Sequence, residues 1–162
     1  MTPQAQSKTS PKDFFFHLLA MIALYASAIS FSAVVWQYIN LWIPDALEKA
    51  QYFSADSARH IIRNSLSILI VFFPTYIATS WSLHRSYLAD TSKRNLWIRK
   101  WLTYFTLFVA AIIILVDLVE LINTFLNGEL TLRFFLKVLT IFFVAGSIFG
   151  YYIYDLKKFK TE

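Results

Sequence analysis

The stretch that decides the fold is residues 14–43, FFFHLLAMIALYASAISFSAVVWQYINLWI. These 30 residues contain no Asp, Glu, Lys or Arg, and only His17 can carry a charge. About 20 apolar residues are enough for a helix to cross a bilayer, so the stretch predicts a transmembrane helix with length to spare. A cleaved signal peptide is the alternative, because Ala26-Ser27-Ala28 resembles a cleavage site, but the apolar run continues well beyond it.

Three further stretches have the same character, at about residues 61–83, 101–122 and 134–154. Of the 162 residues, 57% are hydrophobic and only 15% are charged, a composition that is unusual for a water-soluble domain. Four spans use nearly all of the chain and leave no room for a soluble catalytic domain. We therefore expect an all-α fold, in which residues 13–158 form a bundle of four transmembrane helices.

The segments outside the spans are short. Residues 1–12, rich in Ser, Thr, Pro and Gln, predict a disordered tail, and residues 159–162 are a C-terminal tail. Residues 44–60 mix charged and apolar side chains, which suits a short helix on the membrane surface and a plain loop equally well. Asn127-Gly128-Glu129 predicts a turn before the fourth span, with Thr131 as the helix cap.

Lys and Arg are unevenly distributed between the two sides of such a bundle. Ten of the 15 fall in the N-terminal tail, the connection between the second and third spans, and the C-terminal end. Because basic residues are retained on the cytoplasmic side, both termini are expected in the cytoplasm. The expected location is the bacterial inner membrane, which a multi-pass protein of this kind crosses four times.

Small and polar side chains recur every three or four residues along each span. Such faces avoid lipid and allow close helix approach, so we expect internal packing, with a polar conduit as the alternative. Gly146 and Gly150 form a G-x-x-x-G, which suits a dimer face or an internal helix crossing. The stripes contain Ala20, Ala23, Ser27, Ser30 and Gln37 in the first span; Ser67, Thr75, Thr79 and Ser82 in the second; Thr103, Thr106, Ala110, Asp117, Glu120, Thr124 and Asn127 in the third; and Thr140, Ser147 and Gly150 in the fourth.

Pro74 lies near the middle of the second span. A proline removes one helix hydrogen bond, so we expect a kink there. Thr75 and Thr79 are near enough in sequence to help satisfy the carbonyl that Pro74 leaves without a donor.

Charged residues within the apolar pattern are the strongest candidates for a functional site. Asp117 and Glu120 share one face of the third span, and Arg63, Arg133 and Lys137 fall at comparable depth in or beside the second and fourth. A charge at a helix centre costs about 2.5 to 3.5 kcal/mol on insertion scales, so these residues are expected to form a charge cluster near the outer face. Structural salt bridges and proton or cation handling are the two interpretations.

Several classes of function are excluded or disfavoured. The chain has no cysteine, which excludes disulfides, thiolate metal sites and thiol nucleophiles. His17, His60 and His84 lack zinc-site spacing, and no hydrolase, zinc-protease or phosphate-binding motif occurs. We expect no enzyme activity, no cofactor, no metal and no nucleic-acid partner, since membrane topology accounts for the net charge of +5.

Several strings of residues resemble a prokaryotic domain-of-unknown-function family of small four-span integral membrane proteins. They are PKDFF at 11–15, Phe73-Pro74, RKWLTY at 99–104, GELTLRFFLK at 128–137 and Tyr151-Tyr152. The resemblance covers about residues 11–158 and implies the same fold and a bacterial inner membrane. It brings no activity and no catalytic residue, although Asp117 and Arg133 match its pattern.

The sequence thus favours a non-enzymatic protein that acts by helix association, with itself as a homo-oligomer or with a larger membrane complex. The alternative is a small proton- or cation-handling transporter or channel subunit that uses the acidic residues near the outer face. The lipid bilayer is the partner common to both interpretations.

Overall fold

The computed structural model describes residues 10–43, 55–89, 97–128 and 131–158, which form four α-helices. These are α1 (Pro11–Trp42), α2 (Ala55–Ala89), α3 (Trp97–Leu126) and α4 (Leu132–Lys158). Each is long and apolar enough to cross a membrane, and the described residues contain no strand. The predicted all-α fold of four helices is confirmed. Residues 1–9 and 159–162 of the predicted tails, and residues 44–54 of the first connection, lie outside the described residues.

Every helix extends beyond the apolar stretch that predicted it. At about 1.5 Å per residue the helices measure roughly 40 to 53 Å, whereas the hydrocarbon core of a bilayer is about 30 Å thick. α1 begins already at Pro11, whose fixed φ suits a first helical turn, so residues 11 and 12 belong to the helix and not to the tail. Each helix is therefore longer than a crossing of the hydrocarbon core requires.

Asn127 and Gly128 form a turn at the end of α3, as predicted, while Glu129 of the predicted turn lies outside the described residues. Gly128 has a φ of 70°, a conformation that glycine adopts without strain. Thr131 caps α4 as predicted, because its Oγ1 accepts a hydrogen bond of 3.2 Å from the amide of Phe134.

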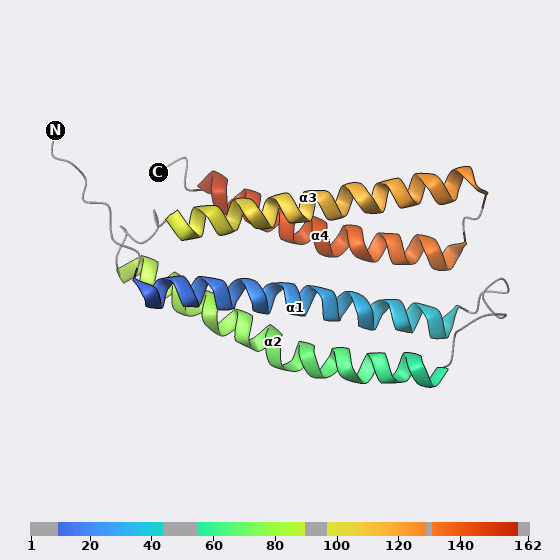
Figure 1. Cartoon of the computed structure of the whole chain (residues 1–162), viewed down its shortest axis with the longest axis horizontal. Helices are drawn as coiled ribbons and strands as arrows, with labels where there is room; N and C mark the ends of the chain where they lie inside the picture. The colour runs from blue at the N-terminus through green and yellow to red at the C-terminus, as the bar shows by residue number, and fades with distance from the viewer. Residues whose placement is uncertain (1–9, 44–54, 90–96, 129–130, 159–162) are drawn as a thin grey trace.

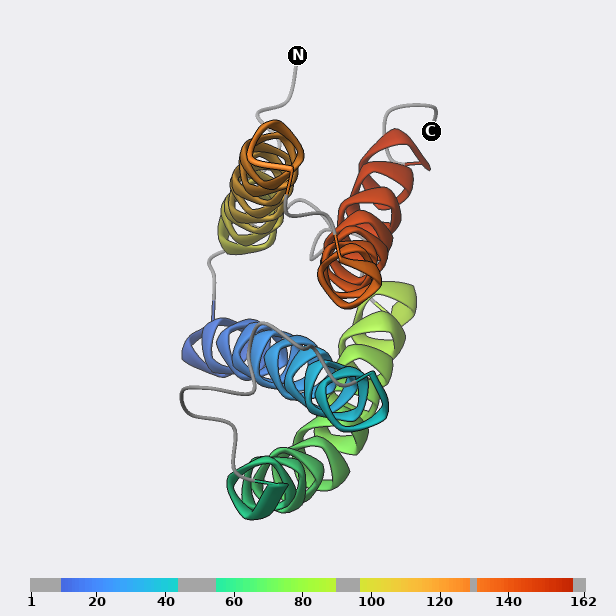
Figure 2. The ribbon, with the colours of Figure 1, turned by 90° about the vertical axis from the view of Figure 1, so that its right-hand side faces the viewer.

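The helices are arranged as two antiparallel pairs. α1 packs against α2 and α3 packs against α4, and α1 also contacts α4 and, less extensively, α3. Figure 1 shows the pairs side by side, with the start of α1 and the end of α4 at the same end of the bundle, and Figure 2 shows α1 between the first part of α2 and the other pair. Within the described ranges, no Cα atom of α2 comes within 8 Å of one in α3 or α4.

α1 supplies the centre of the bundle. The small residues Ala20, Ala23, Ser27 and Ser30 are all buried, as their stripe in the sequence predicted. Small side chains allow neighbouring helices to approach closely, which explains why α1 is the helix that contacts the other three.

Thr106 of α3 is fully buried against α1. Its hydroxyl donates to the carbonyl of Leu102 at 2.9 Å, accepts from the Tyr25 hydroxyl at 3.2 Å and lies 3.0 Å from the sulfur of Met21. Met21 and Leu102 form a hydrophobic cluster with Ile98, and Tyr25 packs against this cluster. This contact joins the two helix pairs.

The other predicted stripes are only partly internal. In α3, Thr103, Thr106 and Ala110 are buried, whereas Glu120 and Asn127 are exposed. In α2 the stripe splits, since Thr79 is buried but Ser67 and Ser82 are exposed. In α4, Ser147 and Gly150 are exposed and Thr140 is half-buried. Small residues predict close approach but not whether the approaching helix belongs to the same chain.

α2 changes direction part-way along its length (Figure 1). Pro74 lies inside this helix and has no amide hydrogen to donate to the carbonyl of Ile70. The expected help from two threonines is not found: the Thr75 hydroxyl donates to Val71 at 2.7 Å, and that of Thr79 lies 2.7 Å from the Thr75 carbonyl. That Pro74 causes the bend stays a prediction.

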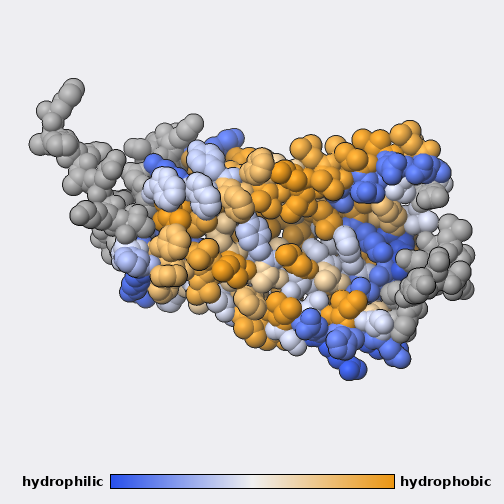
Figure 3. All heavy atoms as spheres, in the orientation of Figure 1, coloured by the Kyte–Doolittle hydropathy of each residue, from blue (hydrophilic) through white to orange (hydrophobic). Residues whose placement is uncertain are grey.

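Hydrophobic side chains cover the middle of the face shown in Figure 3, while hydrophilic ones gather at the end opposite the chain termini. Large apolar side chains such as Ile70, Leu115 and Phe143 are each at least 60% exposed. Water-soluble monomers rarely show such extensive apolar surface. The surface is compatible with a multi-pass membrane protein.

Candidate functional site

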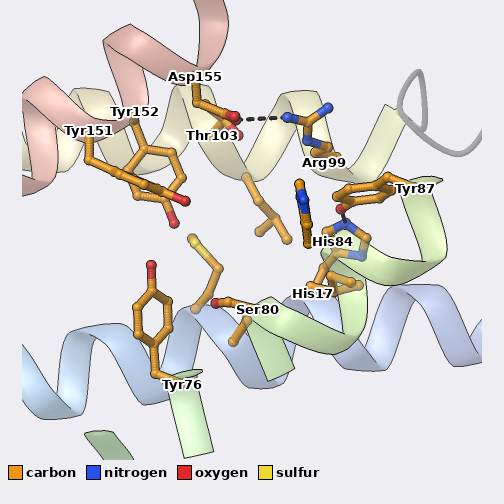
Figure 4. Close-up of a pocket in the computed structure, with 14 residues that line it drawn as sticks. His17, Tyr76, Ser80, His84, Tyr87, Arg99, Thr103, Tyr151, Tyr152 and Asp155 are labelled. Carbon is orange, nitrogen blue, oxygen red and sulfur yellow. Dashed lines mark hydrogen bonds and ion pairs between the residues drawn. The ribbon is translucent and has the colours of Figure 1, made fainter. Parts of the chain in front are cut away.

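The candidate site is a pocket at the end of the bundle where the chain termini lie (Figure 4). Its lining residues come from all four helices, namely from the beginnings of α1 and α3 and the ends of α2 and α4. Its volume is about 140 Å³. All of the α2 residues in the lining come after Pro74 in the sequence, so the direction taken by the second half of α2 decides whether the pocket forms.

His17 is buried and both of its ring nitrogens are engaged. Nδ1 lies 2.6 Å from the backbone carbonyl of Asp13, and because a carbonyl only accepts, Nδ1 carries the hydrogen and donates. In this neutral tautomer Nε2 accepts, and it lies 2.5 Å from the hydroxyl of Tyr87, which donates. The contact joins the start of α1 to the end of α2.

Arg99 and Asp155 form an ion pair with a distance of 2.7 Å between Nη2 and Oδ2. The guanidinium of Arg99 also lies over the ring of Tyr87, 5.0 Å from its centroid, a cation–π arrangement. The pair joins α3 to α4 and, through Tyr87, reaches α2. Both charged side chains are mostly buried, at 13% and 28% exposure, so water screens the attraction only partly.

Three more tyrosines provide hydroxyl groups. In Figure 4 the hydroxyls of Tyr76 and Tyr152 point toward one another across the pocket, and Ser80 lies beside Tyr76. The side chains of Ser80 and Tyr152 are both close enough to the Tyr76 hydroxyl to interact with it. The rings of Tyr151 and Tyr152 meet edge to face with centroids 5.3 Å apart.

The chemistry of this pocket is therefore hydrogen bonding by neutral groups around one internally balanced ion pair. Among the described residues no group of three His, Asp or Glu side chains is placed to hold a metal ion. Hydroxyls, an imidazole and aromatic rings are groups that orient a small ligand or a chain of water molecules.

The residues of the predicted charge cluster lie toward the opposite end of the bundle, near the ends of α2, α3 and α4. Arg133 is 5% exposed, and its Nε donates to Oδ1 of Asn40 in α1 at 2.8 Å. The backbone carbonyl of Lys137 accepts a hydrogen bond of 3.2 Å from the indole of Trp36. These contacts join α4 to α1.

The acidic members of the cluster lie differently. Oδ2 of Asp117 is buried and has no hydrogen-bond partner within the described ranges. Glu120 and Arg63 are exposed. In the described part of the chain no ion pair joins Asp117 or Glu120 to Arg63 or Lys137, so the charge cluster stays a prediction.

The glycine pair of α4 faces away from the bundle. A Cβ atom added at Gly146 or Gly150 meets nothing within 4 Å, so neither glycine serves an internal helix crossing in the described structure. Of the two roles that the sequence left open, this observation favours a surface for another helix.

Sequence reasoning missed the pocket. His17 and His84 were considered only as metal ligands, and Tyr151 and Tyr152 only as part of the family resemblance. His17 and Arg99 lie near the starts of α1 and α3 and Asp155 near the end of α4, so all three are at one end of the bundle. That shared level was visible in the sequence, but it does not show which of these side chains meet.

Residues 13–152 match the family described as "Domain of unknown function (DUF5671)". The chain belongs to this family. The match extends over most of each helix and over every pocket residue except Asp155. No curated protein and no solved structure matches the chain. The family description names no activity, so the function of this DUF5671 domain has to be argued from its geometry.

Proposed function

We propose that the protein is a non-enzymatic, multi-pass protein of the bacterial inner membrane that acts by helix association, with a second copy of itself or with a larger membrane complex. The observation that supports this proposal is the outer face of α4, which contains Gly146, Ser147 and Gly150, flanked by Phe143 and Tyr154. All five residues are exposed.

This face has the shape of a helix-docking surface. Phe143 and Tyr154 are 66% and 67% exposed, and the space beside both glycines is open. Lipid chains gain nothing from small residues on a helix, whereas a second helix gains close backbone contact from them. Association through α4 gives a function to small residues that the described packing does not use.

Replacement of the glycines tests the proposal. Gly146→Leu and Gly150→Leu are expected to weaken self-association at least about tenfold, because each adds a side chain where a second helix must approach. Ala78→Leu is the matched control, since Ala78 is exposed on α2. The measurement is single-molecule photobleaching of labelled protein in lipid vesicles over a range of protein-to-lipid ratios.

Two outcomes decide this test. Equal association in the glycine variants and in Ala78→Leu contradicts a role for the α4 face. A wild-type protein that is monomeric at all densities contradicts self-association, and comparison of wild type with Gly150→Leu in affinity purification from native membranes then tests the larger complex.

The proposed orientation places both termini in the cytoplasm. It is supported by the excess of basic residues on the side of the termini. Because the chain has no native cysteine, Ser54→Cys is expected to react with a membrane-impermeant thiol reagent in cells with a permeabilised outer membrane, and Ser92→Cys is not. Both positions lie outside the described residues. The reverse labelling pattern inverts the topology.

Proton or cation handling by Asp117 is the second candidate function, favoured by its buried, unpartnered Oδ2. A lone carboxylate at membrane depth is costly unless it binds a proton, a cation or a partner. Flux measured in proteoliposomes separates the candidates, since the association proposal expects no flux. Flux that Asp117→Asn abolishes supports this second candidate.

A further inference from the structure

The geometry points to the four-helix pocket as a binding site for the uncharged, ring-sized headgroup of a membrane-soluble molecule of the quinone class. This inference concerns the inner pocket and is independent of association through the outer face of α4. It follows from the size of the pocket, its charge balance, its hydroxyl groups and its depth.

The pocket accommodates about one six-membered ring, and because it is partly open, the substituents on such a ring can extend out of it. The pocket measures about 140 Å³, and an engineered apolar cavity of about 150 Å³ in another protein holds one benzene molecule. A haem or a nucleotide is too large for this volume. The apolar part of the lining, Ala20, Met21, Leu83 and Leu102, offers contacts that suit a flat ring.

The charges in the pocket favour an uncharged ligand. Asp155 pairs with Arg99 at 2.7 Å and neutralises its positive charge. A phosphate or carboxylate ligand would need that positive charge for its own binding. Both nitrogens of His17 are engaged by Asp13 and Tyr87. A charged headgroup would have to break the ion pair and leave one mostly buried charge without its partner, which is unfavourable.

The hydroxyl groups favour a ligand that accepts hydrogen bonds. The hydroxyls of Tyr76, Ser80 and Tyr152 lie together in the lining of the pocket, and each hydroxyl has one hydrogen that it can donate. The Tyr151 hydroxyl also points into the pocket (Figure 4). A quinone ring carries two carbonyl oxygens that accept such bonds.

The depth of the pocket suits the headgroup of an amphiphile. Trp81 near the end of α2 and Trp97 and Trp101 at the start of α3 are exposed and lie at the same end of the bundle as the pocket. Tryptophan concentrates at the membrane–water boundary. The pocket lies where α2 and α4 make no close backbone contact. A headgroup at this level places an attached hydrocarbon tail toward the membrane interior.

Photoaffinity labelling in phosphatidylcholine nanodiscs tests the site. The probe is a short-chain azido-ubiquinone analogue, with decylubiquinone and decanol as competitors that carry the headgroup or only a tail. Labelling is expected to saturate, to map to peptides that contain Tyr76 and Tyr152, and to be displaced by decylubiquinone but not by decanol.

Two variants and a matched control sharpen the result. Tyr152→Phe keeps the ring but removes a hydroxyl and should raise the decylubiquinone concentration for half-displacement about threefold to tenfold. Tyr154→Phe removes an exposed hydroxyl from the same helix and should change nothing. Ala20→Leu adds bulk to the pocket and should abolish saturable labelling, with circular dichroism confirming that the helices persist.

The inference is overturned if labelling does not saturate, if it spreads over lipid-facing peptides of all four helices, or if Tyr152→Phe and Tyr154→Phe give the same displacement curve. In those cases the pocket holds water alone. Gly146→Leu should leave the labelling unchanged, and Tyr152→Phe should leave self-association unchanged. Failure of the binding-site proposal can therefore be distinguished from failure of the association proposal.

Discussion

The two ends of the bundle handle their polar residues differently. At the end with the chain termini, polar side chains from all four helices meet around one pocket and include the pair Arg99–Asp155. At the opposite end, Asp117 has a buried oxygen without a partner within the described ranges, and Glu120 and Arg63 are exposed. Both ends hold charged residues near the ends of apolar helices, yet only one brings opposite charges from two helices into contact in the described structure.

The difference teaches that depth along a helix does not determine contact. Asp117 and Arg63 were placed together because they lie at similar depth, but α2 and α3 do not pack against each other in the described part of the chain. Arg99 and Asp155 meet because α3 and α4 are antiparallel neighbours, so the start of one helix lies beside the end of the other. Partner choice depends on which helices are adjacent.

The largest loss of stability is expected from Arg99→Ala. It leaves Asp155 mostly buried without its partner and removes the cation–π contact with Tyr87, so we expect a loss of about 2 to 3 kcal/mol. Unfolding by denaturant in detergent micelles, followed by circular dichroism, measures it. Arg85→Ala is the control, because it removes a cation–π contact to the exposed Trp81.

The double variant decides whether the ion pair itself is responsible. If it is, Arg99→Ala combined with Asp155→Ala should lose less stability than the sum of the two single changes, because neither charge is then left alone. Additive losses contradict the pairing.

A smaller loss, about 1 to 2 kcal/mol, is expected from Asn40→Ala. The change removes the acceptor of Arg133 Nε on a side chain that is 5% exposed. Asn123→Ala, at an exposed position near the same end of α3, is the control. Equal unfolding free energies for the two variants would show that the contact between α1 and α4 contributes nothing.

Much of the fold was available from the sequence, because the requirement to satisfy backbone groups in hydrocarbon leaves few alternatives to helices. The apolar runs located all four helices, and the buried stripe of α1 was identified from Ala20 to Ser30. The stripes of α2 and α4 were partly misread, since Ser67, Ser147 and Gly150 are exposed. Periodicity identifies a distinctive face but not what covers it.

The candidate site was not available in the same way. The pocket depends on the direction of α2 after Pro74, which brings Tyr76 and Tyr87 near residues about 70 positions away in sequence, such as His17 and Tyr152. A kink is predictable from a proline, but its direction depends on the packing of α1 against α2. Contacts between helices at such separations cannot be derived from spacing along one chain.

Pro74→Ala should change geometry more than stability, with an effect on the unfolding free energy below about 1 kcal/mol. The segment from Pro74 to Leu88 is roughly 20 Å long, so straightening a bend of about 20° moves its end by roughly 7 Å. Spin labels at Leu88→Cys and Tyr154→Cys, both exposed, measure this by double electron–electron resonance. If the distance between the two labels is the same in Pro74→Ala, in wild type and in the control Ile77→Ala, then packing and not Pro74 bends α2.

The smallest effect on stability is expected from Asp117→Asn. Its comparison with Arg99→Ala tests most directly whether charged residues contribute differently to stability at the two ends of the bundle. Asparagine keeps the shape of the side chain but removes its charge, and no described residue forms an ion pair with Asp117 that could be lost. The unfolding free energy should therefore stay within about 0.5 kcal/mol of wild type, in contrast to Arg99→Ala at the other end. A loss of about 2 kcal/mol that is non-additive with replacement of Arg63 or Lys137 would instead establish the charge cluster as a set of salt bridges. Asp117→Leu extends the test, because the removal of a polar group from hydrocarbon should then raise stability unless Asp117 contacts a partner outside the chain.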